Sequence, residues 1–318
     1  MKLVTGGAGF IGAAVVRSLL HRGQDVRIVD DLSKASPSPV PMEVEHLTGD
    51  IADPQICARA MKNADVCFHL AAKIGGIGYF HRYPADILDQ NNQMLSTLFR
   101  AATDEGAKVA YVSSSMVFER AEEFPTSEGA IDRFPPPFSA YGFSKLVGEW
   151  YCRAFHEQFG TPFAIARPFN AYGPGEQPEK EPGLAHVIPD LIAKVLEGER
   201  PVTLFGDGSQ TRSFTYVDDV ADAIVRIGLD PRADGQDFNI GTGVETSVRE
   251  LLRLVWRACG RTGEPEVRSG DPLPVDVPRR VPDVRKIEQV LGWRARVTLE
   301  EGLQRTVDWH RALARDKA

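Results

Sequence analysis

Over the first half of the chain, short apolar runs rich in β-branched residues alternate with longer stretches whose apolar positions recur at helical spacing. The short runs predict β-strands and the longer stretches predict helices. Strands are expected at 2–4, 25–30, 44–47, 65–70 and 108–113. Helices are expected at 10–22, 54–63 and 84–105. Because alternating strands and helices form parallel sheets covered on both faces, the pattern predicts an α/β fold with a doubly wound parallel sheet, whose ligands bind at the carboxyl ends of the strands.

After about residue 167 the alternation weakens and fewer strands are evident. One helix at 139–159 precedes this change, and further helices are expected at 185–197, 218–228, 247–259 and 299–313. Three segments are rich in Pro and Gly: 125–137, 173–183 and 263–280. We expect the first to lead into the helix at 139–159, the second to be a mobile lid, and the third to lack regular structure. The second half therefore predicts a smaller region that closes over the edge of the sheet.

The composition narrows the class of protein. Of 318 residues, 42% are hydrophobic and 25% are charged, which is typical of a globular protein and excludes a disordered chain. A net charge of −7, from 37 basic and 44 acidic residues, argues against nucleic acid or an anionic membrane as a partner. The four cysteines are scattered, so neither a metal site nor a disulfide framework is expected. No apolar run reaches the ~18 residues that span a bilayer, and we expect a cytoplasmic protein.

A glycine-rich motif, TGGAGFIG at 5–12, lies between the first expected strand and helix. Its glycines let the backbone turn sharply and approach a pyrophosphate, to which the helix N-terminus donates N–H groups. The acid pair Asp30 and Asp31 ends the next strand, where a carboxylate accepts both hydroxyls of a ribose and repels a 2′-phosphate. The motif therefore predicts NAD rather than NADP. The alternative is a tight structural turn followed by surface acids.

A second motif, YxxxK, places Tyr141 and Lys145 on one face of a helix. A Lys ammonium near a phenol stabilises the phenolate and lowers its pKa, so that Tyr141 can take a proton from a sugar hydroxyl. Three serines at 113–115 end the strand expected at 108–113, and one hydroxyl there can bind the same substrate oxygen. An exposed surface pair is the alternative for YxxxK alone.

Together these motifs resemble the extended short-chain dehydrogenases/reductases. TGGAGFIG, VDDLS, HLAA, VSSSMVF, YGFSK and RPFNAYGP occur in the order and spacing of that family, and GDGSQTRSFTYVDD resembles its sugar-nucleotide enzymes. The resemblance covers the whole chain and implies a Rossmann-type sheet, a tightly held NAD and a nucleotide-diphosphate sugar as substrate. We expect 1–167, with a return segment at about 205–232, to bind NAD. Residues 168–204 and 233–318 would form a smaller α/β substrate-binding region.

The resemblance assigns roles to individual residues, with Ser114, Tyr141 and Lys145 as the catalytic triad. Besides Tyr141 and Lys145, it implies cofactor contacts for Gly6, Gly9, Phe10, Ile11, Gly12, Asp30, Asp31, Leu32, Ser33, Asp50, Ile51, Leu70, Ala71, Ala72, Asn91, Pro168 and Phe169. It implies substrate contacts for Lys73, Gly75, Gly76, Ser115, Met116, Asn170, His186, Val187, Arg212 and Arg280. The two arginines would neutralise the diphosphate, because Arg forms bidentate charge-assisted bonds to phosphate. A surface salt bridge is the alternative for either one alone.

Other stretches bear on the reaction. AAKIGGIG at 71–78 and AHVIP at 185–189 resemble GDP-fucose synthase and GDP-mannose 3,5-epimerase, whose catalytic Cys is replaced here by Met116. The 4,6-dehydratases carry an Asp-Glu pair in place of Ser115 and Met116, and the Glu is the base that removes the C5 proton. Glu119, three residues after Met116, is a weak substitute for that base. Chemistry that needs only Ser, Tyr, Lys and NAD favours epimerisation at C4 through a transient 4-keto sugar. The alternatives are 3,5-epimerisation, 4,6-dehydration, 4-keto reduction and a non-catalytic dinucleotide sensor.

The helices expected at 84–105 and 139–159 carry apolar residues at helical spacing. Core packing explains such positions without any partner. The resemblance adds that relatives dimerise by pairing these two helices into a four-helix bundle. We therefore expect a homodimer.

Overall fold

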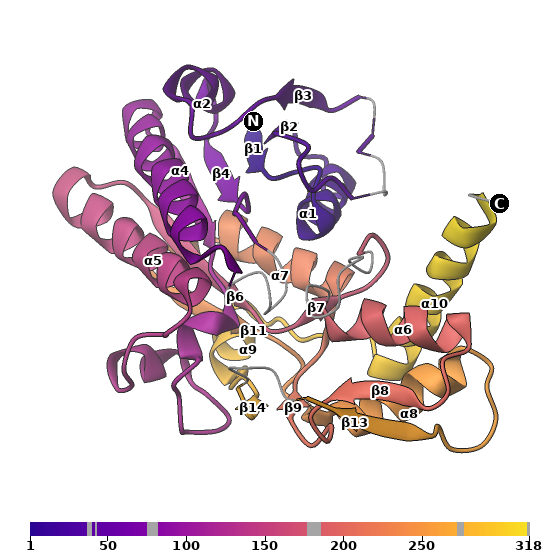
Figure 1. The fold of residues 1–318 in the computed structure, drawn as a ribbon. Helices are drawn as coiled ribbons and strands as arrows, with labels where there is room; N and C mark the ends of the chain where they lie inside the picture. The colour runs from indigo at the N-terminus through magenta and orange to yellow at the C-terminus, as the bar shows by residue number, and fades with distance from the viewer. Residues whose placement is uncertain (37–39, 42, 75–81, 177–185, 272–276, 317–318) are drawn as a thin grey trace.

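The computed structural model describes residues 1–36, 40–41, 43–74, 82–176, 186–271 and 277–316. At its centre is a seven-stranded parallel sheet with the order β11-β6-β5-β4-β1-β2-β3 (Figure 1). The strands are β1 (Lys2–Thr5), β2 (Val26–Asp30), β3 (Glu45–Thr48), β4 (Val66–His69), β5 (Lys108–Val112), β6 (Phe163–Pro168) and β11 (Asp237–Ile240). The strand order reverses between β1 and β4, and doubly wound sheets bind their ligands at such a point. The predicted Rossmann-type α/β fold is confirmed.

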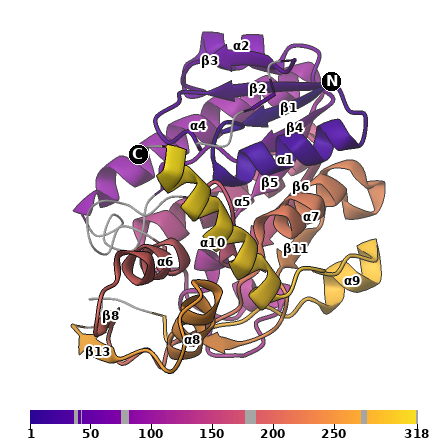
Figure 2. The same ribbon diagram turned by 90° about the vertical axis from the view of Figure 1, so that its right-hand side faces the viewer.

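Helices cover both faces of this sheet (Figures 1 and 2). On one face lie α1 (Phe10–His21) and α7 (Val217–Leu229), joined by α9 (Arg285–Leu291). On the other lie α2 (Pro54–Met61), α4 (Pro84–Glu105) and α5 (Ala140–Phe159). Because side chains alternate along a strand, Val4 of β1 packs in the first core and Leu3 in the second.

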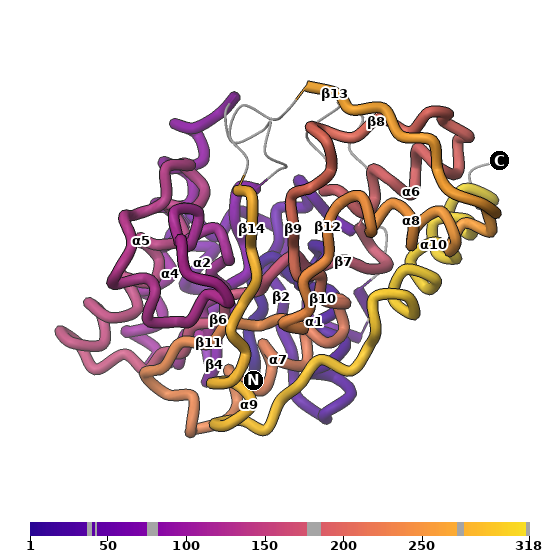
Figure 3. Tube along the Cα trace, turned by 90° about the horizontal axis from the view of Figure 1, so that it is seen from below, coloured from indigo at the N-terminus to yellow at the C-terminus, as the bar shows by residue number. Residues whose placement is uncertain are grey.

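The remaining elements build a smaller region around a third apolar core. Its helices are α6 (Val187–Glu197), α8 (Val248–Ala258) and α10 (Leu299–Asp316). Short strands form three small sheets, with the orders β10-β7, β12-β9-β14 and β13-β8 (Figure 3). These strands are β7 (Ala171–Tyr172), β8 (Val202–Phe205), β9 (Thr211–Arg212), β10 (Thr215–Tyr216), β12 (Thr246–Ser247), β13 (Val267–Gly270) and β14 (Arg279–Arg280).

The prediction that 263–280 lacks regular structure is wrong, because β13 pairs with β8 and β14 with β9. Pro265 and Pro278 lie just outside these strands, where a missing N–H removes no ladder bond. The segment expected to return to the NAD-binding part ends at about residue 232. β11 follows that segment in the chain, yet it forms an edge strand of the main sheet. The lid expected at 173–183 lies largely outside the described residues, from 177 onward. Among the helices that the structure describes, none is long and apolar enough to cross a membrane.

Candidate active site

A cavity of about 1160 Å³ lies at the carboxyl ends of the central strands, between the sheet and the smaller region. The β1–α1 turn, the ends of β2 and β5, helix α5 and the start of α6 all contribute to its lining. The described residues predicted to contact cofactor or substrate line it, with the exceptions of Leu32, Asn91 and Phe169. Gly75 and Gly76 lie outside the described residues.

The structure gives each of the three exceptions another environment. Leu32 has a left-handed φ of 62° and is 44% exposed, so its side chain lies at the surface. Phe169 is fully buried and packs against Phe118, with ring centroids 6.2 Å apart. It therefore packs away from the cavity, although the preceding residue, Pro168, lines it. Asn91 is buried on α4 and accepts a hydrogen bond from the backbone N of Lys73 at 2.7 Å, so it supports the cavity wall from behind.

The turn from β1 into α1 has room for a diphosphate because its glycines lack side chains. Gly6 has a φ of +67°, and a Cβ there would lie 2.8 Å from the backbone N of Ala71. A Cβ on Gly12 would lie 1.9 Å from the carbonyl oxygen of Gly6. At the end of β2, Asp30 is nearly buried and its carboxylate accepts a hydrogen bond from the N–H of Ala8 at 2.9 Å. The turn, the helix N-terminus and this carboxylate together fit a dinucleotide with an unmodified ribose.

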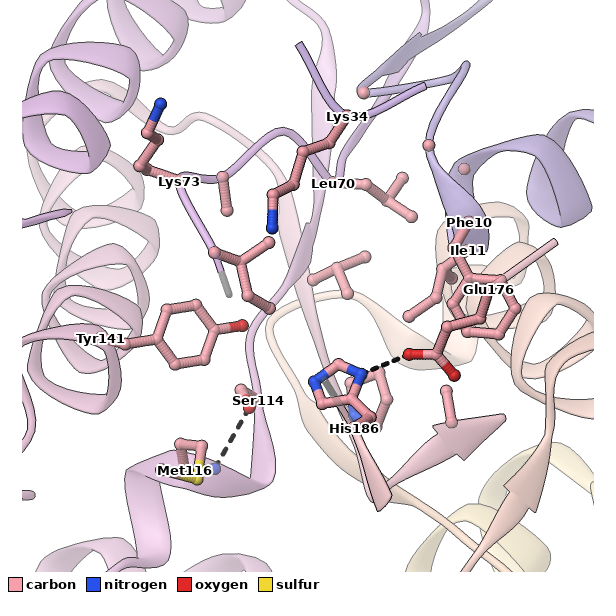
Figure 4. Close-up of a pocket in the computed structure, with 18 of the residues that line it drawn as sticks. Phe10, Ile11, Lys34, Leu70, Lys73, Ser114, Met116, Tyr141, Glu176 and His186 are labelled. Carbon is pink, nitrogen blue, oxygen red and sulfur yellow. Dashed lines mark hydrogen bonds and ion pairs between the residues drawn. The ribbon is translucent and has the colours of Figure 1, made fainter. Parts of the chain in front are cut away.

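Ser114, Tyr141 and Lys145 are brought together at this cavity. Ser114 follows β5, whereas Tyr141 and Lys145 lie one turn apart on α5. The side chains of Tyr141 and Ser114 both point into the cavity (Figure 4), and Ser114 acts on the phenol to lower its pKa. Nζ of Lys145 donates to the carbonyl of Val112 at 2.9 Å and lies 5.9 Å from the centroid of the Tyr141 ring. The arrangement brings two hydroxyls and one ammonium group into a buried site.

Burial dominates the ionisation of this group. It raises the pKa of Tyr141 to about 12, although the hydrogen bond with Ser114 and the charge of Arg280 act in the opposite direction. It lowers the pKa of Lys145 to about 8. The expectation that the phenol has a lowered pKa is therefore wrong for this structure. Helical spacing indicates a neighbouring cation but gives no measure of how far burial disfavours the phenolate.

Two arginines lie side by side on the cavity wall. Arg212 in β9 and Arg280 in β14 are register partners in adjacent strands (Figure 3), so their side chains project from the same face. Arg212 is buried, and the guanidinium of Arg280 contacts the sulfur of Met116. Asn170 also lines the cavity, and its side-chain amide donates to the carbonyl of Ser213 at 2.9 Å. Two adjacent guanidinium groups suit a diphosphate.

Two further candidates for proton transfer are already engaged. His186, just before α6, forms an ion pair with Glu176 (Figure 4), whose negative charge raises the pKa of the imidazole. Glu119 is buried and accepts hydrogen bonds from the backbone N and the hydroxyl of Ser139 at 2.9 and 2.5 Å. The same hydroxyl accepts from the N–H of Gly142 at 2.9 Å and caps α5. Glu119 therefore supports the start of the helix that carries Tyr141.

The cavity residues that sequence reasoning missed include Lys34, Ser36 and Glu176. The hydroxyl of Ser36 donates to the carbonyl of Gly175 at 2.8 Å, so the segment after β2 meets the loop after β7. Lys34 points into the cavity (Figure 4), and its place four residues after Asp30 was a usable signal. Glu176 had no such signal, because only the tertiary fold brings it to His186.

Comparison with known proteins places the chain in a family. Residues 2–241 match the NAD dependent epimerase/dehydratase family. The chain is 36% identical to a UDP-glucose 4-epimerase of Mycolicibacterium smegmatis, over 97% of this chain and 98% of the relative. It is similar to the crystal structure of the Thermotoga maritima UDP-glucose 4-epimerase with UDP-glucose, with a TM-score of 0.89 and 33% identity over 98% and 99% of the two chains. It is also similar to the Thermus thermophilus UDP-glucose 4-epimerase complex with NAD, with a TM-score of 0.86 and 31% identity over 98% and 99%. The chain belongs to the NAD-dependent epimerase/dehydratase family.

Proposed function

We propose that this protein is an NAD-dependent epimerase that inverts C4 of a nucleotide-diphosphate sugar through a transient 4-keto sugar. One observation carries the proposal: the hydroxyls of Ser114 and Tyr141 face a cavity whose wall also carries Arg212 and Arg280. Such a site can hold a diphosphate and exchange a proton with a sugar hydroxyl. Similarity to 4-epimerases solved with UDP-glucose and with NAD supports it.

Each part of the cavity has a task in this reaction. The glycine turn and Asp30 would hold NAD, which when bound accepts a hydride from the sugar carbon and returns it to the other face. Tyr141 takes the proton of the sugar hydroxyl and later gives it back, while Ser114 binds the same sugar oxygen. Lys145 would contact the cofactor ribose and supplies the positive charge beside the phenol. Arg212 neutralises the diphosphate together with its strand neighbour.

The cavity favours C4 chemistry over 3,5-epimerisation, 4,6-dehydration and 4-keto reduction. Removing a proton from C3 or C5 requires a base, and Met116 cannot act as one. Glu119 is bonded to Ser139 and does not line the cavity. His186 is held by Glu176, which favours its protonated form. Asp30 disfavours the 2′-phosphate of NADPH, the usual cofactor of a reductase.

Deuterium incorporation distinguishes these reactions. We expect incubation in D₂O with UDP- and GDP-sugars, without added cofactor, to give a C4 epimer that carries no deuterium at C3 or C5. NMR of the product measures both features. Deuterium at C3 or C5 would indicate 3,5-epimerisation, and loss of water would indicate dehydration. Oxidation of added NADPH by a 4-keto sugar would indicate a reductase, and a protein that converts none of these sugars would refute the proposal.

We also propose a cytoplasmic protein with two functional parts. All four cysteines are buried and free, which is typical of a reducing compartment. Residues 1–167, with about 205–232, would hold NAD. Residues 168–204 and 233–318, apart from β11 and α9 at the main sheet, would hold the nucleotide sugar together with Arg212. Asn170, His186 and Arg280 on the cavity wall support this division.

We further propose a homodimer formed by α4 and α5 of two copies. On α5, Trp150 is 64% exposed and Phe143 is 42% exposed, and their spacing of seven residues places them on one face. The two helices pack against each other in one chain, so two chains would form a four-helix bundle.

Trp150→Glu should convert the dimer to a monomer, because it places a charge in the apolar centre of the proposed interface. Light scattering coupled to size exclusion at micromolar concentration measures the mass. Val244→Glu is the matched control, since Val244 has the same 64% exposure but lies in the loop between β11 and β12, away from α4 and α5. A wild type that elutes as a monomer would contradict the proposal.

A further inference from the structure

Behind the cavity, two fully buried charged side chains form the centre of a cluster whose other members are partly exposed, and the proposed reaction assigns this cluster no role. Arg167, near the end of β6, and Glu149, on α5, are both fully buried. Nε and Nη2 of Arg167 donate to the two carboxylate oxygens of Glu149 at 2.7 and 2.6 Å, which makes the pair bidentate. Nη2 of Arg167 also lies 2.8 Å from the carboxylate of Asp237 in β11. The same carboxylate forms an ion pair with Lys286 of α9 at 2.7 Å. The cluster thus joins α5, β6, β11 and α9.

This cluster contacts every segment that carries a member of the triad. Glu149 follows Lys145 by four residues on α5, so the two side chains lie on one face of the helix. One carboxylate oxygen of Glu149 accepts the hydroxyl of Ser113 at 2.6 Å, and Ser113 directly precedes Ser114. The guanidinium of Arg167 lies 5.2 Å from the ring centroid of Phe118, which ends the short 3₁₀ helix after Ser114. Arg167 and Glu149 therefore connect the strand end that holds Ser114 to the helix that holds Tyr141.

Stability alone does not account for such a pair. Two charges buried together lose their hydration, and apolar side chains of similar volume stabilise a fold as well or better. A bidentate pair differs in fixing both the distance and the angle between the elements that carry it. Catalytic groups require this accuracy, since they must be held within about 0.5 Å of the productive geometry.

We propose that Glu149, held by Arg167, is a positioning residue that sets the separation between the hydroxyls of Ser114 and Tyr141. It acts through Ser113 on the strand side and through α5 on the helix side. The proposal rests on the proposed function for its kinetic consequence, but the positioning itself is a geometric claim.

The double variant Glu149→Leu with Arg167→Met tests it by replacing the ion pair with apolar side chains. Asp237 keeps Lys286 as its partner, so no buried charge is left alone and we expect the variant to fold. We expect kcat to fall about 20-fold. The KM for the nucleotide sugar should stay within about twofold, because the groups that bind the diphosphate are unchanged. Crystal structures should show the hydroxyl separation changed by about 0.5 Å or more.

Two further variants separate positioning from general destabilisation. Lys108→Met removes an ion pair, 2.5 Å long, between the buried Lys108 at the opposite end of β5 and the half-exposed Asp234, and should lower the Tm without changing kcat. Ser113→Ala removes the side-chain contact between Glu149 and the strand end, and should lower kcat about fivefold. This single variant decides the matter if the double variant does not fold.

An unchanged separation between the two hydroxyls would overturn the positioning role. A kcat that stays within about twofold of wild type, both in Ser113→Ala and in a folded double variant, would also overturn it. An inactive wild-type protein would instead refute the proposed function. In that case the crystallographic comparison would still test whether the ion pair sets the separation.

Discussion

Replacing Tyr141 by Phe should lower kcat about 10³-fold while leaving the affinity for NAD nearly unchanged. The Tyr141 ring is 5% exposed and packs with Ile87, so Phe fills the same space and the fold is retained. The variant loses only the hydroxyl that faces the cavity. Both proton transfers at the sugar oxygen then lack their carrier. Steady-state kinetics measures the loss, and calorimetric titration with NAD measures the affinity.

Tyr216→Phe is the matched control for this prediction. Tyr216 is also buried, at 4% exposure, but it does not line the cavity. Its kcat should stay within about twofold of wild type. If Tyr141→Phe kept at least a tenth of the wild-type kcat, another group would have to carry the proton, and His186 would be the first to test.

Features that depend on neighbours in the sequence were predictable. The β1–α1 turn and the pair Tyr141 and Lys145 are each fixed by local geometry: a strand that leads directly into a helix, and one helical turn. The parallel sheet followed from the alternation of strands and helices. Its full strand order was not predicted, because neither β6 nor β11 was expected as a strand.

Features that depend on register or burial were not predictable. Arg212 and Arg280 become neighbours only through the pairing of β9 with β14, two-residue strands too short to show any periodicity. The pKa of Tyr141 moves opposite to the expectation because burial outweighs the effects of Ser114 and of the Arg280 charge. The ion pair of Glu149 and Arg167 joins residues 18 positions apart on different elements, and neither stands out in the sequence from a surface charge. Side chains that position the triad therefore required the tertiary structure.

Replacing Gly12 by Ala should weaken NAD binding about a hundredfold. The new Cβ would lie 1.9 Å from the carbonyl oxygen of Gly6, which is backbone and cannot rotate away. The turn cannot retreat either, because Gly6 already lies so close to Ala71 that a Cβ there would be 2.8 Å from its backbone N. The turn must therefore deform at the point where it would receive the pyrophosphate. Overpacking of this kind costs about 3 kcal/mol, which corresponds to about a hundredfold in Kd.

The NAD content of the purified protein and calorimetric titration both measure this effect. Gly129→Ala is the control, since a Cβ there would meet only the flexible side chain of Arg133 at 3.3 Å and lies away from the cavity. We expect this control to bind NAD like the wild type. If Gly12→Ala bound NAD with unchanged affinity, the cofactor could not lie against the β1–α1 turn. The carboxylate of Asp30, which is tied to that turn through Ala8, would then lose its proposed contact with the ribose as well.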